Sequence, residues 1–109
     1  MAAAILRVAA TLAWVAVGSA VAADDPVAGR AKAQICAVCH GPVGVSVAPD
    51  APNLAGQPAT YLTQQLQHFR SGARKHEVMN VMARTLSDDD IGNLAAWFSA
   101  IRIEATAPP

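Results

Sequence analysis

Two cysteines and a histidine lie together in the segment Cys36-Ala37-Val38-Cys39-His40. Cysteines at this C-x-x-C spacing near the end of a helix project from one face, so both sulfurs can form thioether bonds to the vinyl groups of a single porphyrin. The adjacent histidine is then held beneath the ring, where its neutral imidazole can bind iron. The segment therefore predicts one covalently attached haem c per chain, held through Cys36 and Cys39, with His40 as an iron ligand.

Two other kinds of site use a cysteine pair with this spacing. A thiol–disulfide motif of the thioredoxin type is expected beside a strand–helix–strand pattern, and no segment of this chain alternates as a strand does. A zinc site needs further ligands, yet the chain has no other cysteine, and His68 and His76 lie too far apart for the usual H-x₃₋₅-H spacing. Covalent haem is the favoured interpretation.

A haem that only carries electrons needs a second iron ligand, and four residues are candidates: Met79, Met82, His68 and His76. A thioether is a soft ligand that favours reduced iron and raises the reduction potential, whereas a second histidine would lower it. Both methionines lie in the connection before the last predicted helix, from where either could reach across the haem. The residues alone leave this choice open, because a methionine can equally fill a gap in the core.

A first helix is expected to carry the cysteine motif at its end. Pro26 can begin this helix, with Asp24 or Asp25 as its cap, and Gly29 in its middle would allow another helix to pass close by. Its apolar face is predicted from residues that recur every fourth position: Val27, Ala31 and Ile35.

Residues 41–58 contain four prolines and three glycines without a helical period, which predicts a long loop that wraps something. Pro58 can begin a second helix that ends at Gly72. Its predicted core face consists of Tyr61, Leu62, Leu66 and Phe69. A helical turn is expected around residues 77–84 of the next connection.

The last helix is predicted from Ser87, where Ser87-x-x-Asp90 resembles a capping box. One stripe of this helix is apolar: Ile91, Leu94, Ala95, Phe98 and Ile101. Together these patterns predict an all-α fold with three to four helices and long loops.

Residues 1–23 are predicted to be an export signal peptide, with Arg7 ahead of an apolar run and a cleavage pattern at Ala20-Val21-Ala22. Cleavage is expected after Ala22 or Ala23, and residues 24–109 would then form one domain in the oxidising periplasm. The apolar run is shorter than the roughly 20 residues that a membrane-spanning helix needs, which argues against an uncleaved anchor helix. No membrane insertion is expected after signal removal.

Eight basic and eight acidic residues balance in the whole chain. No basic stripe favours nucleic acid as a partner. The charge balance therefore indicates no particular partner.

Several further segments occur in the order in which one protein family has them. They are Gly29 ahead of C-x-x-C-H, Pro52-Asn53-Leu54-Ala55-Gly56-Gln57, Tyr61-Leu62-x-x-Gln65-Leu66, Phe69-Arg70-x-Gly72, Met79-x-x-Met82-Ala83 and Leu86-Ser87-Asp88-x-Asp90-Ile91-x-x-Leu94-Ala95-Ala96-Trp97-Phe98. Across nearly all of residues 24–109, the chain thus resembles a class I cytochrome c, most closely the single-haem unit of bacterial periplasmic dihaem cytochromes c. The resemblance implies the class I cytochrome c fold, in which helices and long loops wrap around one covalent haem.

The resemblance also implies roles for individual residues. The family's methionine ligand falls on Met79, which leaves Met82 as packing. The carbonyl group of Pro52 is expected to contact the imidazole of His40 and so select the nitrogen that meets the iron. Gly29 and Trp97 are expected where the first and last helices cross.

The implied function is electron transfer by cycling of the haem iron between Fe(II) and Fe(III), without enzymatic activity of its own. Its partners would be an oxidase, a reductase or a dehydrogenase. Dihaem members have two haem motifs, whereas this chain has one. The alternative to a free carrier is therefore the cytochrome c subunit of a periplasmic dehydrogenase complex. A haem enzyme or gas sensor with an open iron position is a further alternative.

Overall fold

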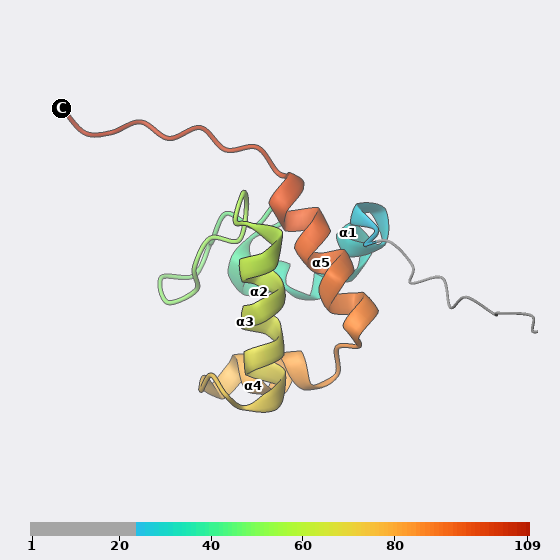
Figure 1. Cartoon of the computed structure of the whole chain (residues 1–109). Coiled ribbons are helices and arrows are strands. Elements are labelled where there is room, and N and C mark those ends of the chain that lie inside the picture. Colours follow the sequence, from blue (N-terminus) through green and yellow to red (C-terminus); the bar gives the residue numbers. More distant parts are fainter. Residues whose placement is uncertain (1–23) are drawn as a thin grey trace, which may run out of the picture.

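The computed structural model describes residues 24–109 (Figure 1). Its elements are α1 (Pro26–Lys32), the 3-10 helix η1 (Ala33–Ile35), α2 (Ala37–His40), α3 (Ala59–Ser71), α4 (Glu77–Arg84) and α5 (Asp88–Ala100). No strand occurs in these residues, which confirms the predicted all-α class. The predicted signal peptide lies outside the described residues, and none of the described helices is long and apolar enough to cross a membrane.

The first helix begins as the sequence predicts, but it buries a different face. The Asp25 side chain accepts a hydrogen bond from the Val27 N–H at 2.8 Å, which caps the helix directly before Pro26. The predicted apolar face is wrong, since Val27 is 77% exposed and both Ala31 and Ile35 are exposed.

The face of α1 that is buried carries a glycine, because α1 crosses α5 at very close range. A Cβ atom on Gly29 would lie 2.9 Å from the Cβ of Trp97 and would also overlap the backbone carbonyl of Asn93. The predicted crossing of Gly29 and Trp97 is therefore confirmed. Ala33, one turn further on, is also buried. Small residues rather than large apolar ones thus line this side of α1, and larger side chains there would push the helices apart.

Helix α5 lies between α1 and α3, and α4 lies across the lower end of α3 (Figure 1). Helix α5 begins with the predicted capping box. The Ser87 hydroxyl accepts a hydrogen bond from the Asp90 N–H, and the Asp90 carboxylate accepts one from the Ser87 N–H, both at 3.0 Å. The predicted stripe of α5 is buried apart from Ile101, which packs at the edge of the core. The core consists of Ala33, Leu62, Phe69, Ala83, Leu86, Ile91, Leu94, Ala95 and Phe98.

Helix α3 ends at Gly72, which adopts a left-handed φ of 83°, as the sequence predicts. Leu62 and Phe69 are buried and Leu66 packs against them. Tyr61 is an exception to the predicted core face, since it is 45% exposed.

The loop of residues 41–58 folds back on itself through backbone hydrogen bonds. The N–H groups of Leu54 and Ala55 both donate to the carbonyl oxygen of Gly44, at 2.7 and 3.0 Å. Gly44 has a φ of 76°, and a Cβ atom there would lie 2.8 Å from the Phe98 ring. The loop is therefore pinned against α5 at a point that only glycine can occupy.

Candidate functional site

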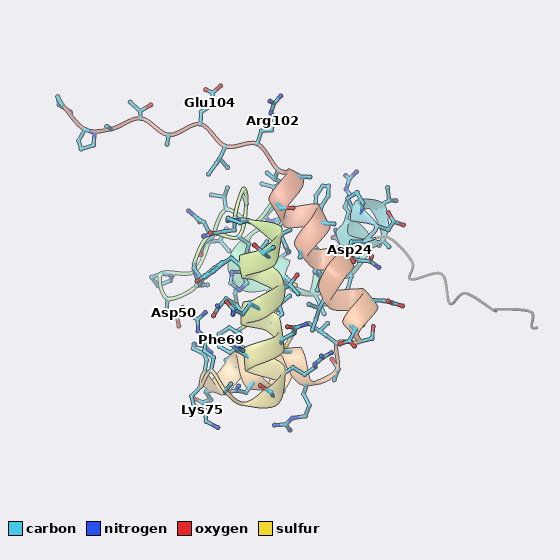
Figure 2. All side chains as sticks on the ribbon, in the orientation of Figure 1. Asp24, Asp50, Phe69, Lys75, Arg102 and Glu104 are labelled. Carbon is cyan, nitrogen blue, oxygen red and sulfur yellow. The ribbon has the colours of Figure 1, made fainter. Side chains whose placement is uncertain are left out.

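A cavity of about 540 Å³ lies between the loop, α2, α3, α4 and α5. All the residues proposed from the sequence for haem binding line it: Cys36, Cys39, His40, Pro52, Met79 and Met82. The rest of its wall is largely apolar and includes Leu62, Leu66, Phe69, Leu86, Leu94 and Phe98. Asp50 from the loop and Phe69 from α3 both line the cavity, and Figure 2 shows them on the same side of the molecule.

A single turn of helix sets the geometry of the cysteine motif. The N–H groups of Cys39 and His40 both donate to the carbonyl oxygen of Cys36, at 3.3 and 3.0 Å. Both cysteines are half-buried, and neither is in a disulfide. Their side chains and that of His40 therefore reach one cavity from one turn of the backbone.

Burial raises the pKa of the Cys36 thiol, and the nearby charge of Lys32 opposes that rise only partly. A thiol–disulfide enzyme needs a thiolate nucleophile, which a lowered pKa supplies. The surroundings of Cys36 raise the pKa instead and so disfavour the thiolate. The surroundings of Cys36 therefore do not activate it as a nucleophile. Within residues 24–109, no three His, Cys, Asp or Glu side chains are grouped to hold a bare metal ion.

His40 is 8% exposed, and its Nδ1 lies 2.7 Å from the carbonyl oxygen of Pro52. A carbonyl can only accept, so this contact requires a proton on Nδ1 and leaves the lone pair of a neutral imidazole on Nε2. Pro52 is the residue for which the resemblance implied such a contact. The arrangement makes Nε2 of His40 the nitrogen able to coordinate a metal.

Met79 and Met82 both lie on helix α4, which covers the residues 77–84 where the sequence predicts a helical turn. Residues three apart on a helix lie on neighbouring parts of one face, which is why both methionines border the same cavity. Both are half-buried, and Met79 packs against the hydrophobic core. The fold thus brings both candidate thioethers to the site.

Of the two histidines that are candidate ligands, His76 borders the cavity and His68 does not. His76 borders the cavity, but its Nδ1 accepts a hydrogen bond from the Met79 N–H at 3.2 Å and caps α4. His68 lies on α3 and does not contribute to the cavity wall within the described residues.

Arg74 is also a member of the cavity wall. Its guanidinium lies 4.6 Å from the centre of the Phe69 ring and donates to Gln65 Oε1 at 2.7 Å. Arg74 is in the connection between α3 and α4, where no helical period exists to indicate a direction for its side chain. Only the folded chain shows that it borders the site.

The cavity fits a haem in size, polarity and donor set. Its volume falls in the range of about 300–1,000 Å³ that is usual for cofactor and small-molecule sites. Its wall is apolar, as the body of a porphyrin requires. Two thiols, a histidine nitrogen with a free lone pair and two thioethers border the same space. These are the groups that would attach a haem and bind its iron.

Comparison with known proteins agrees with this site. Residues 24–98 match the family described as cytochrome c oxidase, cbb3-type, subunit III. The chain is 44% identical over 81 residues to cytochrome c-554(548) of Halomonas halodenitrificans, a match that covers 72% of this chain and 98% of that protein.

Two solved structures have the same fold. Reduced cytochrome c4 from Pseudomonas stutzeri matches with a TM-score of 0.69 and 40% identity, covering 73% of this chain and 47% of that one. A thiosulfate dehydrogenase from Marichromatium purpuratum matches with a TM-score of 0.69 and 36% identity, covering 84% and 22%. The chain spans less than half the length of the curated cytochromes c4 that it matches, 41% and 44% of two of them. The protein is a member of the cytochrome c family, with the class I cytochrome c fold and a covalently bound haem c.

Proposed function

We propose that the protein is a periplasmic electron carrier with one haem, in which His40 and Met79 are the axial iron ligands and Cys36 and Cys39 form the thioether bonds. The observation that carries the proposal is the convergence of these four side chains on one apolar cavity. When bound, the haem supplies an iron that accepts and releases a single electron.

Different side chains of the site would hold different parts of the haem. The two cysteines lie about one helical turn apart and would form the thioether bonds that attach the haem. Pro52 accepts the Nδ1 proton of His40, which fixes the ring orientation and keeps Nε2 available for the iron. A thioether ligand and an apolar wall both favour the less charged, reduced iron. This combination suits a carrier of relatively high potential.

Two protein ligands would leave no coordination position for a substrate. That closure separates a carrier from a haem enzyme or a gas sensor, in which one iron position is open or labile. Electrons would then pass through an edge of the haem at the protein surface.

The residues at the rim of the cavity support electron transfer through a haem edge at the protein surface. Several residues that border the cavity are also exposed and apolar: Ile35, Val38, Tyr61 and Val78. Val38, inside the haem motif, is 82% exposed. An apolar rim of this kind suits a small, transient contact with a redox partner such as an oxidase, a reductase or a dehydrogenase.

The proposal is tested on the protein exported and matured in a bacterium that attaches haem c. We expect the haem to stay with the protein in acidic acetone, the oxidised protein to show a methionine–iron charge-transfer band, and the reduced protein to bind carbon monoxide poorly at neutral pH. Rapid carbon monoxide binding would refute the closed site. Mass analysis of the same preparation should show a mature chain that begins at Ala23 or Asp24, which tests the predicted signal peptide and periplasmic location.

One observation favours a second candidate, in which the protein is the cytochrome c subunit of a periplasmic dehydrogenase complex. A thiosulfate dehydrogenase structure contains a unit of this fold, which matches 84% of this chain at 36% identity. Co-purification of the native protein with a larger redox enzyme would favour this alternative. A monomer that is reduced by a separately purified dehydrogenase would favour the free carrier.

A further inference from the structure

Helix α4 carries Met79 in its first turn, yet the helix is too short to hold its position alone. It has 8 residues, and isolated helices below about 12–15 residues are marginally stable in water. Ala83 is its only fully buried residue, and one side of the helix, with Val78 and Val81, is exposed. Contacts outside the helix must therefore determine where the Met79 side chain lies.

Asn80, the residue directly after Met79, makes three such contacts with one amide group. Its Oδ1 accepts from the His76 N–H at 2.7 Å. Its Nδ2 donates to the carbonyl oxygens of Phe69 and Arg74, both at 2.8 Å. Both amide protons are thus used, and the half-buried side chain joins the end of α3, the connection that follows and the start of α4.

The bond to Phe69 also completes the end of α3. Helix α3 stops at Ser71, so the carbonyl group of Phe69 belongs to the last turn, whose carbonyls lack partners within the helix. Asn80 supplies the missing donor. The orientation of α4 is therefore tied directly to the backbone of α3.

His76 holds the chain on the other side of Met79. Its Nδ1 accepts from the Met79 N–H at 3.2 Å, and its ring stands edge-on to Phe69 with the ring centres 6.4 Å apart. Histidine is not among the residues usually preferred as an N-cap, which are Ser, Thr, Asp and Asn. Here its ring both caps the helix and borders the cavity.

We propose that Asn80 and His76 are positioning residues that hold the thioether of Met79 in place to bind the haem iron. The inference rests on the proposed role of Met79 as the axial ligand. Neither side chain needs to touch the iron, since each acts on the backbone on one side of the ligand. Removal of either should loosen the iron–sulfur bond before the helical fold is lost.

The test compares Asn80→Ala with Asn93→Ala in the mature holoprotein. Asn93 is a matched control, because its Oδ1 accepts from the Asp25 N–H at 2.7 Å and so joins α5 to the start of α1, away from Met79. The methionine–iron charge-transfer band and the helical circular dichroism are followed together during heating. We expect Asn80→Ala to lose the band at least 10 °C below the loss of helix, and Asn93→Ala to lose both signals together.

A second pair of variants separates positioning from general stability. His76→Ala removes the acceptor, whereas His76→Asn keeps a short side chain that caps helices well. We expect His76→Ala to weaken the band in the folded protein and His76→Asn to restore it. If the band survives unchanged in both Asn80→Ala and His76→Ala, or always disappears together with the helix signal, the positioning role is wrong. If the unaltered protein lacks the band, the assignment of Met79 as ligand is itself wrong.

Discussion

A methyl group added to Gly29 should separate the two helices that hold the haem motif against the core. In the helix, alanine is intrinsically better than glycine by about 1 kcal/mol. Against this gain, the new Cβ would lie 2.9 Å from the Trp97 Cβ and 2.6 Å from the carbonyl carbon of Asn93. Overpacking a tight site costs about 1–3 kcal/mol, and the upper end applies where the obstacle is backbone that cannot turn away. The expected net loss of unfolding free energy is therefore about 2 kcal/mol.

Gly92 offers a matched control in the same helix pair. It is also a buried helical glycine, but a Cβ atom there would meet the carboxylate of Asp24, the end of a side chain that can rotate aside. We expect Gly92→Ala to be neutral or to stabilise the protein by up to about 1 kcal/mol.

Thermal unfolding of the two mature holoproteins, followed by circular dichroism, measures the difference. A loss of about 2 kcal/mol should lower the Tm of Gly29→Ala by about 8–16 °C in a domain of this size. A Gly29→Ala protein as stable as the unaltered one would show that α1 and α5 can separate without cost, and the close crossing would then not be what stabilises the motif.

Three further perturbations test the site and the last helix. Met79→Ala should abolish the methionine–iron charge-transfer band and increase carbon monoxide binding, while Met82→Ala keeps the band; the reverse result would exchange their roles. Cys36→Ala or Cys39→Ala should reduce the yield of haem-containing exported protein in a haem-stain assay, and unchanged yields would argue against thioether attachment. The capping-box hydrogen bond from the backbone holds the pKa of Asp90 below its usual value, with burial opposing this and Lys32 assisting it. The stabilisation that the ionised Asp90 carboxylate provides is thus present above the unfolded pKa of about 3.9. It is lost as the pH falls through the lower folded pKa. Asp90→Asn should therefore be less stable than the unaltered protein at pH 6 and lose less stability between pH 5 and pH 2; parallel pH profiles would contradict this.

The features that the sequence predicts well are those set by residues close together in the chain. Cys36, Cys39 and His40 lie within one helical turn, so their relation to one another is a property of that turn. The same holds for the Ser87 and Asp90 capping box, whose two hydrogen bonds span three residues. The apolar stripe of α5 is also predictable, because it lies on the most enclosed helix of the fold.

The face of α1 could not be predicted in this way. The four-residue repeat through Val27 has the period of a buried helix face, yet Val27 is exposed and Gly29 is buried. Hydrophobic periodicity reports which face could be buried when large side chains form the contact. It does not indicate a contact in which two backbones approach so closely that only small residues fit.

The sequence predicts a haem held through Cys36 and Cys39 with His40 beside them, because these are local relations within one turn. The other side of the site depends on how the helices pack. Met79 reaches the cavity because α4 is tied to α3 by Asn80 and capped by His76, through contacts with Phe69 and Arg74 that no periodic pattern records. Such contacts join different elements, and their geometry exists only after the helices have packed.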